Sequence, residues 1–201
     1  MPGTLYLVAT PLGNLGDMTF RAVDTLKAVA VIAAEDTRRA RILCEHFGIG
    51  TRLTSMPAFR EDAKAGGLVE RLFAGEDVAV ISDAGSPGIS DPGTLLVQQA
   101  VAAGVRVVPI PGPSAVVAAL SASGLRTDRF YFAGFLPRSG TSRKEALAAL
   151  ARLEATLVLY ESPRRLGETL EELARELGPR RAAVARELTK VHEEFVRGTL
   201  P

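Results

Sequence analysis

Residues 82–93 hold the densest group of chemistry-bearing side chains and turn residues in the sequence. Three glycines, two prolines and two Ser-Asp pairs follow a short apolar run there. Loops that only connect two elements are usually shorter. Glycines let a ligand approach the backbone, and Asp83 has the acceptors for an amine or a ribose hydroxyl. Asp83 is equally able to stabilise a local turn. Asp91 is expected to cap the next helix, with Pro92 at its first position.

A second glycine-containing loop, at residues 10–17, follows the first apolar run. Glu35 and Asp36 come about 20 residues later, near where a dinucleotide-binding fold places its ribose-binding acid. Gly13 and Gly16 do not have the G-x-G-x-x-G spacing, and the sequence contains no G-K-[ST] phosphate loop. A dinucleotide-dependent oxidoreductase therefore stays an alternative, beside an ordinary strand-to-helix turn.

The histidines and the cysteine argue against a metal centre. His46 and His192 lack ligand spacing, and the single cysteine, Cys44, excludes a disulfide framework and a cysteine-rich zinc site. We expect no metal. No apolar run approaches the roughly 20 residues of a membrane helix, and the N-terminus lacks a basic targeting region. We therefore expect a soluble, cytoplasmic protein without a membrane partner.

The charges are balanced overall but divide unevenly along the chain. The 201 residues include 24 Lys or Arg and 23 Asp or Glu, which gives a net charge of +1 and excludes a uniformly basic nucleic-acid binder. Residues 1–112 carry 10 basic and 12 acidic side chains, whereas residues 113–201 carry 14 and 11. Arg138, Arg143 and Lys144 lie on a loop with Gly and Ser and suit phosphates, although a solvated loop has the same composition.

The elements that position these residues alternate between short β-branched runs and longer segments of helical period. This alternation predicts an α/β fold with a mostly parallel sheet. We expect strands at 5–9, 29–34, 77–82, 105–110, 129–133, 156–160 and 182–186, and helices at 19–27, 37–47 and 63–73, after Pro92, up to about 152, and from Ser162-Pro163 to Gly178. Pro111-Gly112-Pro113 breaks the chain and predicts two domains, 1–112 and 113–201.

Six motifs, in this order, resemble the ribosomal RNA small subunit methyltransferase I family of the tetrapyrrole methylase superfamily. They are LVATPLGNLGD at 7–17, AEDTR at 34–38, SDAGSPGISDPG at 82–93, PIPGPSA at 109–115, YESP at 160–163 and RELTKVHEEF at 186–195. The resemblance covers essentially the whole chain. Members usually continue for several strands and helices beyond the segment like residues 197–200, so we expect the second domain to be incomplete here.

The resemblance implies two α/β domains of tetrapyrrole methylase type, with S-adenosylmethionine (SAM) in the cleft between them, and usually a homodimer. The implied reaction is 2′-O-methylation of a cytidine ribose in 16S ribosomal RNA, within the small ribosomal subunit. Position by position, the implied cofactor contacts are Pro11, Asp83, Ala84, Gly85, Ser86, Ile89, Ser114, Ala115, Tyr160, Glu161, Ala185, Arg186 and Glu187.

Methyl transfer to a ribose oxygen would benefit from a general base that takes the hydroxyl proton. The candidates are Asp36, Glu161 and Glu187, and we favour Glu187 because it follows the last expected strand. We expect the RNA phosphates to meet Arg38, Arg39, Arg138, Arg143, Lys144, Arg164 and Arg165. The alternatives are a tetrapyrrole methyltransferase, the oxidoreductase above, and a non-catalytic RNA-binding assembly factor.

Overall fold

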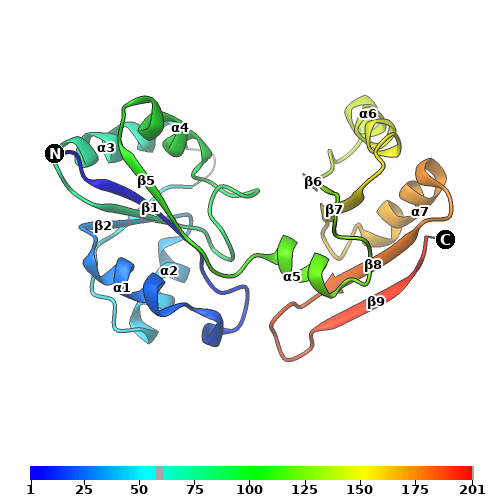
Figure 1. The fold of residues 1–201 in the computed structure, drawn as a ribbon, viewed down its shortest axis with the longest axis horizontal. Coiled ribbons are helices and arrows are strands. Elements are labelled where there is room, and N and C mark those ends of the chain that lie inside the picture. The colour runs from blue at the N-terminus through cyan, green and yellow to red at the C-terminus, as the bar shows by residue number, and fades with distance from the viewer. Residues whose placement is uncertain (58–60, 201) are drawn as a thin grey trace. The chain divides into compact units, whose positions relative to one another are not determined.

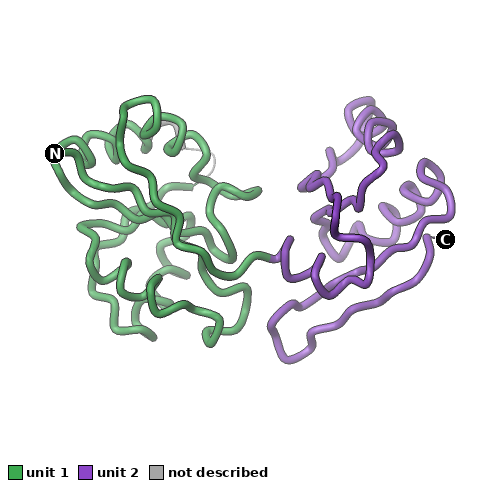
Figure 2. Tube along the Cα trace, in the orientation of Figure 1, with its two compact units in different colours: residues 1–114 green, residues 115–201 purple. Residues whose placement is uncertain are grey.

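The computed structural model describes residues 1–57 and 61–200, and only the backbone of residues 61–63. Figure 1 shows its helices and strands. The chain divides into two compact units, Met1–Ser114 and Ala115–Pro201, which Figure 2 colours separately. The division expected after Gly112 falls two residues before this point.

Unit 1 is built on one parallel sheet. Its strands are β1 Thr4–Val8, β2 Val31–Ala34, β3 Leu53–Ser55, β4 Val78–Ile81 and β5 Arg106–Ile110, in the order β3-β2-β4-β1-β5. Every residue of β2 and β4 is buried. Strands covered on both faces read as continuous apolar runs, and this is why VIAA and VAVI were recognisable in the sequence.

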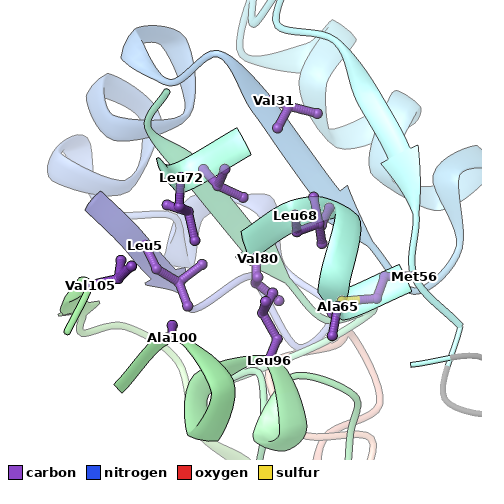
Figure 3. Close-up of a cluster of buried hydrophobic side chains, with 12 residues drawn as sticks. Leu5, Val31, Met56, Ala65, Leu68, Leu72, Val80, Leu96, Ala100 and Val105 are labelled. Carbon is purple, nitrogen blue, oxygen red and sulfur yellow. The ribbon is translucent and has the colours of Figure 1, made fainter. Parts of the chain in front are cut away.

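Helices cover both faces of this sheet. Helices α1 Phe20–Ala28 and α2 Thr37–His46 pack on one face, against residues such as Val8, Ile32 and Ala79. Helices α3 Glu61–Phe73 and α4 Thr94–Ala102 pack on the other face. Figure 3 shows this second cluster, in which Leu68 of α3 and Leu96 of α4 meet Leu5 and Val80 of the strands. Side chains of successive strand residues therefore point to opposite faces of the sheet and belong to the two different core clusters.

This topology fixes where a ligand can reach unit 1. The chain leaves β1 toward α1 on one face, and it leaves the neighbouring strand β4 toward α4 on the opposite face. The two loops therefore separate beyond the carboxyl ends of the strands and leave room between them. Ligands of open α/β sheets bind at such switch points.

Unit 2 contains two separate strand pairs. Its elements are α5 Ala115–Ala122, β6 Phe130–Phe135, α6 Gly140–Ala151, β7 Thr156–Tyr160, α7 Leu166–Leu177, β8 Arg181–Arg186 and β9 Glu194–Thr199. Strands β6 and β7 are parallel, whereas β8 and β9 form an antiparallel hairpin. A leucine core that includes Leu136, Leu147 and Leu173 holds α6 and α7 together.

The structure corrects several local predictions. Strands β3 and β9 and helix α5 were not predicted. Helix α4 begins at Thr94 behind a Gly93 N-cap with φ of 128° and no side-chain cap, so the prediction that Asp91 caps it is wrong. The helix expected from Ser162-Pro163 begins only at Leu166.

Candidate functional site

A pair of backbone hydrogen bonds ties the loop after β1 to the loop after β4. The N–H of Thr10 donates to Gly85 O and the N–H of Gly85 donates to Thr10 O, each over 2.9 Å. The buried Thr10 hydroxyl donates to Ser82 O over 3.1 Å. Gly85 has φ of +82°, a conformation that side-chain-bearing residues rarely adopt. The two loops that flank the switch point are thus joined by backbone contacts.

The loop after β4 is ordered by its own polar groups rather than by regular structure. The Ser82 hydroxyl donates to Gly85 O over 3.1 Å, and the Gly88 N–H donates to Pro92 O over 3.1 Å. The Ser86 hydroxyl reaches Pro113 O, on the loop after β5, over 3.4 Å. These bonds fix the segment that holds the predicted contacts Ala84, Gly85, Ser86 and Ile89, and Ile89 is exposed.

A cavity of about 260 Å³ opens at the carboxyl ends of β1, β2 and β4. Its walls come from the loop after β1, from the start of α2 and from the end of β4. The lining residues are Thr10, Pro11, Leu12, Gly13, Leu15, Ala34, Asp36, Arg39, Ala40, Ile42, Leu43, Ile81, Ser82 and Asp83. The cavity therefore brings together one predicted base (Asp36), one predicted RNA contact (Arg39) and two predicted cofactor contacts (Pro11 and Asp83).

The carboxylates of the cavity are held by the first turn of α2. Asp83 Oδ1 accepts from the Asp36 N–H over 3.2 Å, and Asp83 Oδ2 lies 3.2 Å from Arg39 Nη1. Asp36 is the N-cap of α2 and accepts from the Arg38 N–H over 2.8 Å. The Arg38 side chain also donates to both Asp36 oxygens, and these hydrogen bonds lower the pKa of Asp36 to about 2. Asp36 is consequently a fixed anion and a weak proton acceptor.

Two further carboxyl groups, those of Glu35 and Asp91, lie near Asp83. Burial raises the pKa of Glu35, and the charges of Asp83 and Asp91 raise it further. Burial also raises the pKa of Asp91, with a second contribution from Asp83. The sequence analysis considered Glu35 only as a ribose-binding acid of a dinucleotide site and did not predict that it would lie beside Asp83. The carboxyl ends of β2 and β4 therefore concentrate negative potential.

In unit 2, Glu161 lies at the end of a buried polar chain. Glu161 Oε2 accepts from the Thr169 hydroxyl over 2.8 Å and Oε1 accepts from the Ser162 N–H over 2.8 Å. Arg143 Nη2 in turn donates to Thr169 Oγ1 over 2.8 Å. Burial acts to raise the pKa of Glu161, but the hydrogen bonds from Thr169 and Ser162 and the charges of Arg165 and Arg143 outweigh it and leave the pKa lowered. Glu161 is thus an anion whose two oxygens are already engaged.

Arg143 is a structural residue rather than an exposed phosphate contact. It is only 5% exposed, and Nε donates to Glu172 over 2.7 Å while Nη1 donates to Pro137 O over 2.8 Å. With Nη2 on Thr169, each of its nitrogens is bonded inside unit 2. We therefore withdraw Arg143 from the RNA-contacting residues. Arg143 and Lys144 lie in α6, so the prediction that they lie on a loop is wrong. Lys144 is exposed, as are Arg138 on the preceding loop and Arg164, while Arg165 is half-buried beside Glu161.

Glu187 opens the turn between β8 and β9, the segment that follows Ala185 and Arg186 of β8. Glu187 and Thr189 both have positive φ, at 51° and 67°, without being glycine. Such backbone strain persists where surrounding contacts impose it, and here the Thr189 N–H donates to Glu193 Oε2 over 2.6 Å. The Glu187 carboxylate lies 3.2 Å from Lys190 Nζ and is about half exposed. Of the three predicted bases, Glu187 has the carboxylate most open to a substrate.

Ser114 and Ala115, two other predicted contacts, lie at the start of α5, and Tyr160 ends β7 beside Phe132. Within the described residues, no group of three or more His, Cys, Asp and Glu side chains is arranged to hold a metal ion. The helices in the described part of the chain are all too short or too polar to cross a membrane.

Comparisons with known proteins identify the family. The family model for tetrapyrrole (corrin/porphyrin) methylases matches residues 4–201. A ribosomal RNA small subunit methyltransferase I from Xylella fastidiosa is 53% identical over 99% of this chain and 73% of its own length. The Bacillus subtilis protein of the same name is 49% identical over 98% of this chain and 68% of its own. The chain belongs to this methyltransferase family. The predicted membership is confirmed.

Two solved structures share the fold. Diphthine synthase superposes with a TM-score of 0.75 at 20% identity, covering 98% of this chain and 82% of that one. A uroporphyrin-III C-methyltransferase from Thermus thermophilus, solved with S-adenyl homocysteine, gives 0.69 at 23% identity, covering 98% and 89%. The predicted α/β fold of tetrapyrrole methylase type is therefore confirmed.

The buried position of Arg143 predicts a large effect on stability. Arg143→Met should lower the free energy of unfolding by about 3–5 kcal/mol, because it leaves Glu172 without its buried ion-pair partner and Thr169 Oγ1 without its donor. Lys144→Met, at the exposed neighbouring position, should change it by less than about 0.5 kcal/mol. Urea denaturation followed by circular dichroism measures both. Equal midpoints for the two variants would contradict the assignment.

Proposed function

We propose that the protein methylates the 2′ oxygen of a cytidine ribose in 16S ribosomal RNA, using SAM as the methyl donor. The observation that carries this proposal is the identity of about half of all residues to small subunit rRNA methyltransferases along essentially the whole chain. The oxidoreductase and the tetrapyrrole methyltransferase have no comparable support. A ribosomal substrate fits a cytoplasmic protein, and the family resemblance adds a homodimer to the proposal.

The loops of unit 1 fit the cofactor. A Cβ on Gly85 would lie 3.2 Å from Leu12 Cδ2, and one on Gly112 would lie 3.0 Å from Ala9 Cβ, so the backbone is closely packed where a ligand must approach. Asp83, with Glu35 and Asp91 nearby, gives a negative potential that suits a sulfonium cation. When bound, SAM supplies an electrophilic methyl group.

The residues proposed to hold SAM divide between the two units. In unit 1 they are Pro11, Asp83, Ala84, Gly85, Ser86, Ile89 and Ser114. In unit 2 they are Ala115, Tyr160, Glu161, Ala185, Arg186 and Glu187. Asp83 would accept hydrogen bonds from the ligand, since a carboxylate offers only acceptors. The order imposed by Ser82, Ser86 and Thr10 means that little conformational entropy is lost when the ligand binds.

We assign to Glu187 the role of the general base that accepts the proton of the ribose hydroxyl. Asp36 is a weak acceptor because Arg38 stabilises its anion, and both oxygens of Glu161 are engaged in the interior of unit 2. Glu187 is exposed, and its strained turn holds it beside Lys190. A carboxylate that is fixed and accessible can accept the proton as the oxygen attacks the methyl group.

The RNA is proposed to meet cations of both units. Arg38 and Arg39 lie at the start of α2 and Lys144 lies in α6. Arg138 lies on the loop before α6, and Arg164 and Arg165 lie just before α7. Contacts to phosphates release counterions, so the affinity for RNA should fall steeply as salt increases. These contacts position the RNA without specifying its sequence.

The proposed function is tested by incubating the protein with methyl-labelled SAM and isolated small ribosomal subunits. We expect about one methyl group per subunit, on a single cytidine whose 3′ phosphodiester resists alkaline hydrolysis, because the 2′ oxygen is blocked. Large subunits under the same conditions serve as the control. Label on a base, or no transfer at a SAM concentration that saturates the protein, would refute the proposal.

The role of Glu187 is tested with Glu187→Gln. We expect the single-turnover rate of methylation to fall by about 10²-fold or more, as for loss of a general base, and raising the pH should restore part of it. Glu168→Gln, an exposed site on α7, is the matched control and should keep the wild-type rate. An unchanged single-turnover rate in Glu187→Gln would remove Glu187 from the mechanism.

A further inference from the structure

Of the residues proposed to hold SAM, only Pro11 and Asp83 line the cavity of unit 1, so most of this cavity lies outside the proposed cofactor contacts. Pockets that bury a drug-sized ligand usually measure about 300–1,000 Å³. At about 260 Å³, this cavity suits a single heterocyclic ring. We infer that it receives the base of the target nucleotide, an amino-bearing pyrimidine swung out of the RNA and read along its edge. This inference rests on the proposed function and adds how the substrate base is chosen.

Aliphatic side chains at the cavity offer a surface for the face of a base. Ile42 is 66% exposed and Leu15 is 37% exposed, although both are large and apolar. Leu12 and Pro11 add apolar surface on the β1 side. The face of a pyrimidine ring is apolar, so its entry would remove Ile42 and Leu15 from water. An exposed apolar rim around a polar interior is the arrangement that a pyrimidine base needs.

The polar groups of the cavity match the edge of cytosine. Asp36 and Asp83 present only acceptors, and Arg39 presents donors. Arg39 Nη1 lies 3.2 Å from Asp83 Oδ2, so a donor and an acceptor stand side by side. Cytosine offers an amino donor next to a ring-nitrogen acceptor and a carbonyl acceptor. Uracil places a carbonyl oxygen where the amino group would be, and that oxygen would face a carboxylate.

Cations beside the cavity would hold the flanking phosphates. Arg38, Arg39 and Arg41 are all exposed on the first turns of α2, and Arg39 also lines the cavity. A nucleotide whose base enters the cavity keeps its phosphates outside, next to these guanidinium groups. Arginine forms bidentate contacts with phosphate. The same short segment therefore provides one arginine for the base edge and others for the backbone.

The test compares small subunits assembled with unmodified 16S rRNA and with rRNA in which the mapped target cytidine is uridine. Methyl transfer from SAM is measured as kcat/KM on each substrate. Since both nucleotides carry the 2′ hydroxyl, any difference reports reading of the base. We expect the wild-type protein to prefer cytidine by about 10- to 100-fold, the discrimination typical of a bidentate base contact.

Two arginine variants separate base reading from phosphate contact, and a third variant tests the apolar rim. Arg39→Gln should reduce the cytidine preference about tenfold. Arg41→Gln, the same charge change on the same helix but outside the cavity lining, should raise KM for both subunits and leave the preference within about twofold. Ile42→Asp should raise KM for the cytidine subunit without changing the SAM dissociation constant. General damage to the fold lowers both rates together and does not alter their ratio.

The outcomes distinguish this inference from the proposed function. No transfer to the unmodified subunit would refute the proposed function itself. Transfer to both subunits at equal kcat/KM would leave that function intact and overturn the base cavity. A wild-type preference that Arg39→Gln does not change would also overturn it, because the base would then be read elsewhere.

Discussion

The reciprocal hydrogen bonds between Thr10 and Gly85 are the contact on which the site of unit 1 depends. The loops after β1 and β4 diverge toward helices on opposite faces of the sheet, so nothing in the parallel ladder holds their tips together. The backbone pair does so, and Thr10 extends it to Ser82 through its hydroxyl. Gly85 can join the pair because it adopts φ of +82°. The contact holds Thr10, which lines the cavity, and fixes the loop that carries Asp83 at the same time.

Acidic and basic side chains form two adjacent groups at this site. Asp83, Glu35 and Asp91 lie together at the ends of β2 and β4, where burial and mutual repulsion raise the pKa of Glu35 and of Asp91. The arginines of α2 are exposed, and Arg39 Nη1 lies 3.2 Å from Asp83 Oδ2. A cationic methyl donor needs a negative potential, and a polyanionic RNA needs a positive one. At the N-terminus of α2 the acidic groups and the exposed arginines lie next to each other. The nearly neutral net charge of the chain conceals this separation.

The sequence revealed the parts of the fold that have strong local signals. The buried runs of β2 and β4 and the glycine-rich loop at 82–93 were readable because continuous apolar strands and turn residues carry their own pattern. Strand β3 was missed because it has only three residues. Strand β9 was missed because it is mostly exposed and begins within the charged motif at 186–195, so it has no apolar run. Asp91 was misassigned as a cap because Gly93 turns the chain before the helix begins. The burial of Arg143 depends on Thr169 and Glu172 of another helix, and no local pattern reports such a contact.

The dependence of the site on the Thr10–Gly85 pair is tested most directly by SAM affinity in Gly85→Ala, measured by calorimetry. A Cβ there is strained by the positive φ and lies 3.2 Å from Leu12 Cδ2, whereas Gly104→Ala introduces the same kind of strain at φ of +71° into open space. We expect Gly85→Ala to weaken SAM binding by about tenfold or more, as for about 1–3 kcal/mol of lost contacts. Gly104→Ala should bind SAM as the wild type does. Equal SAM affinity in the two variants would show that the site does not depend on the Thr10–Gly85 pair.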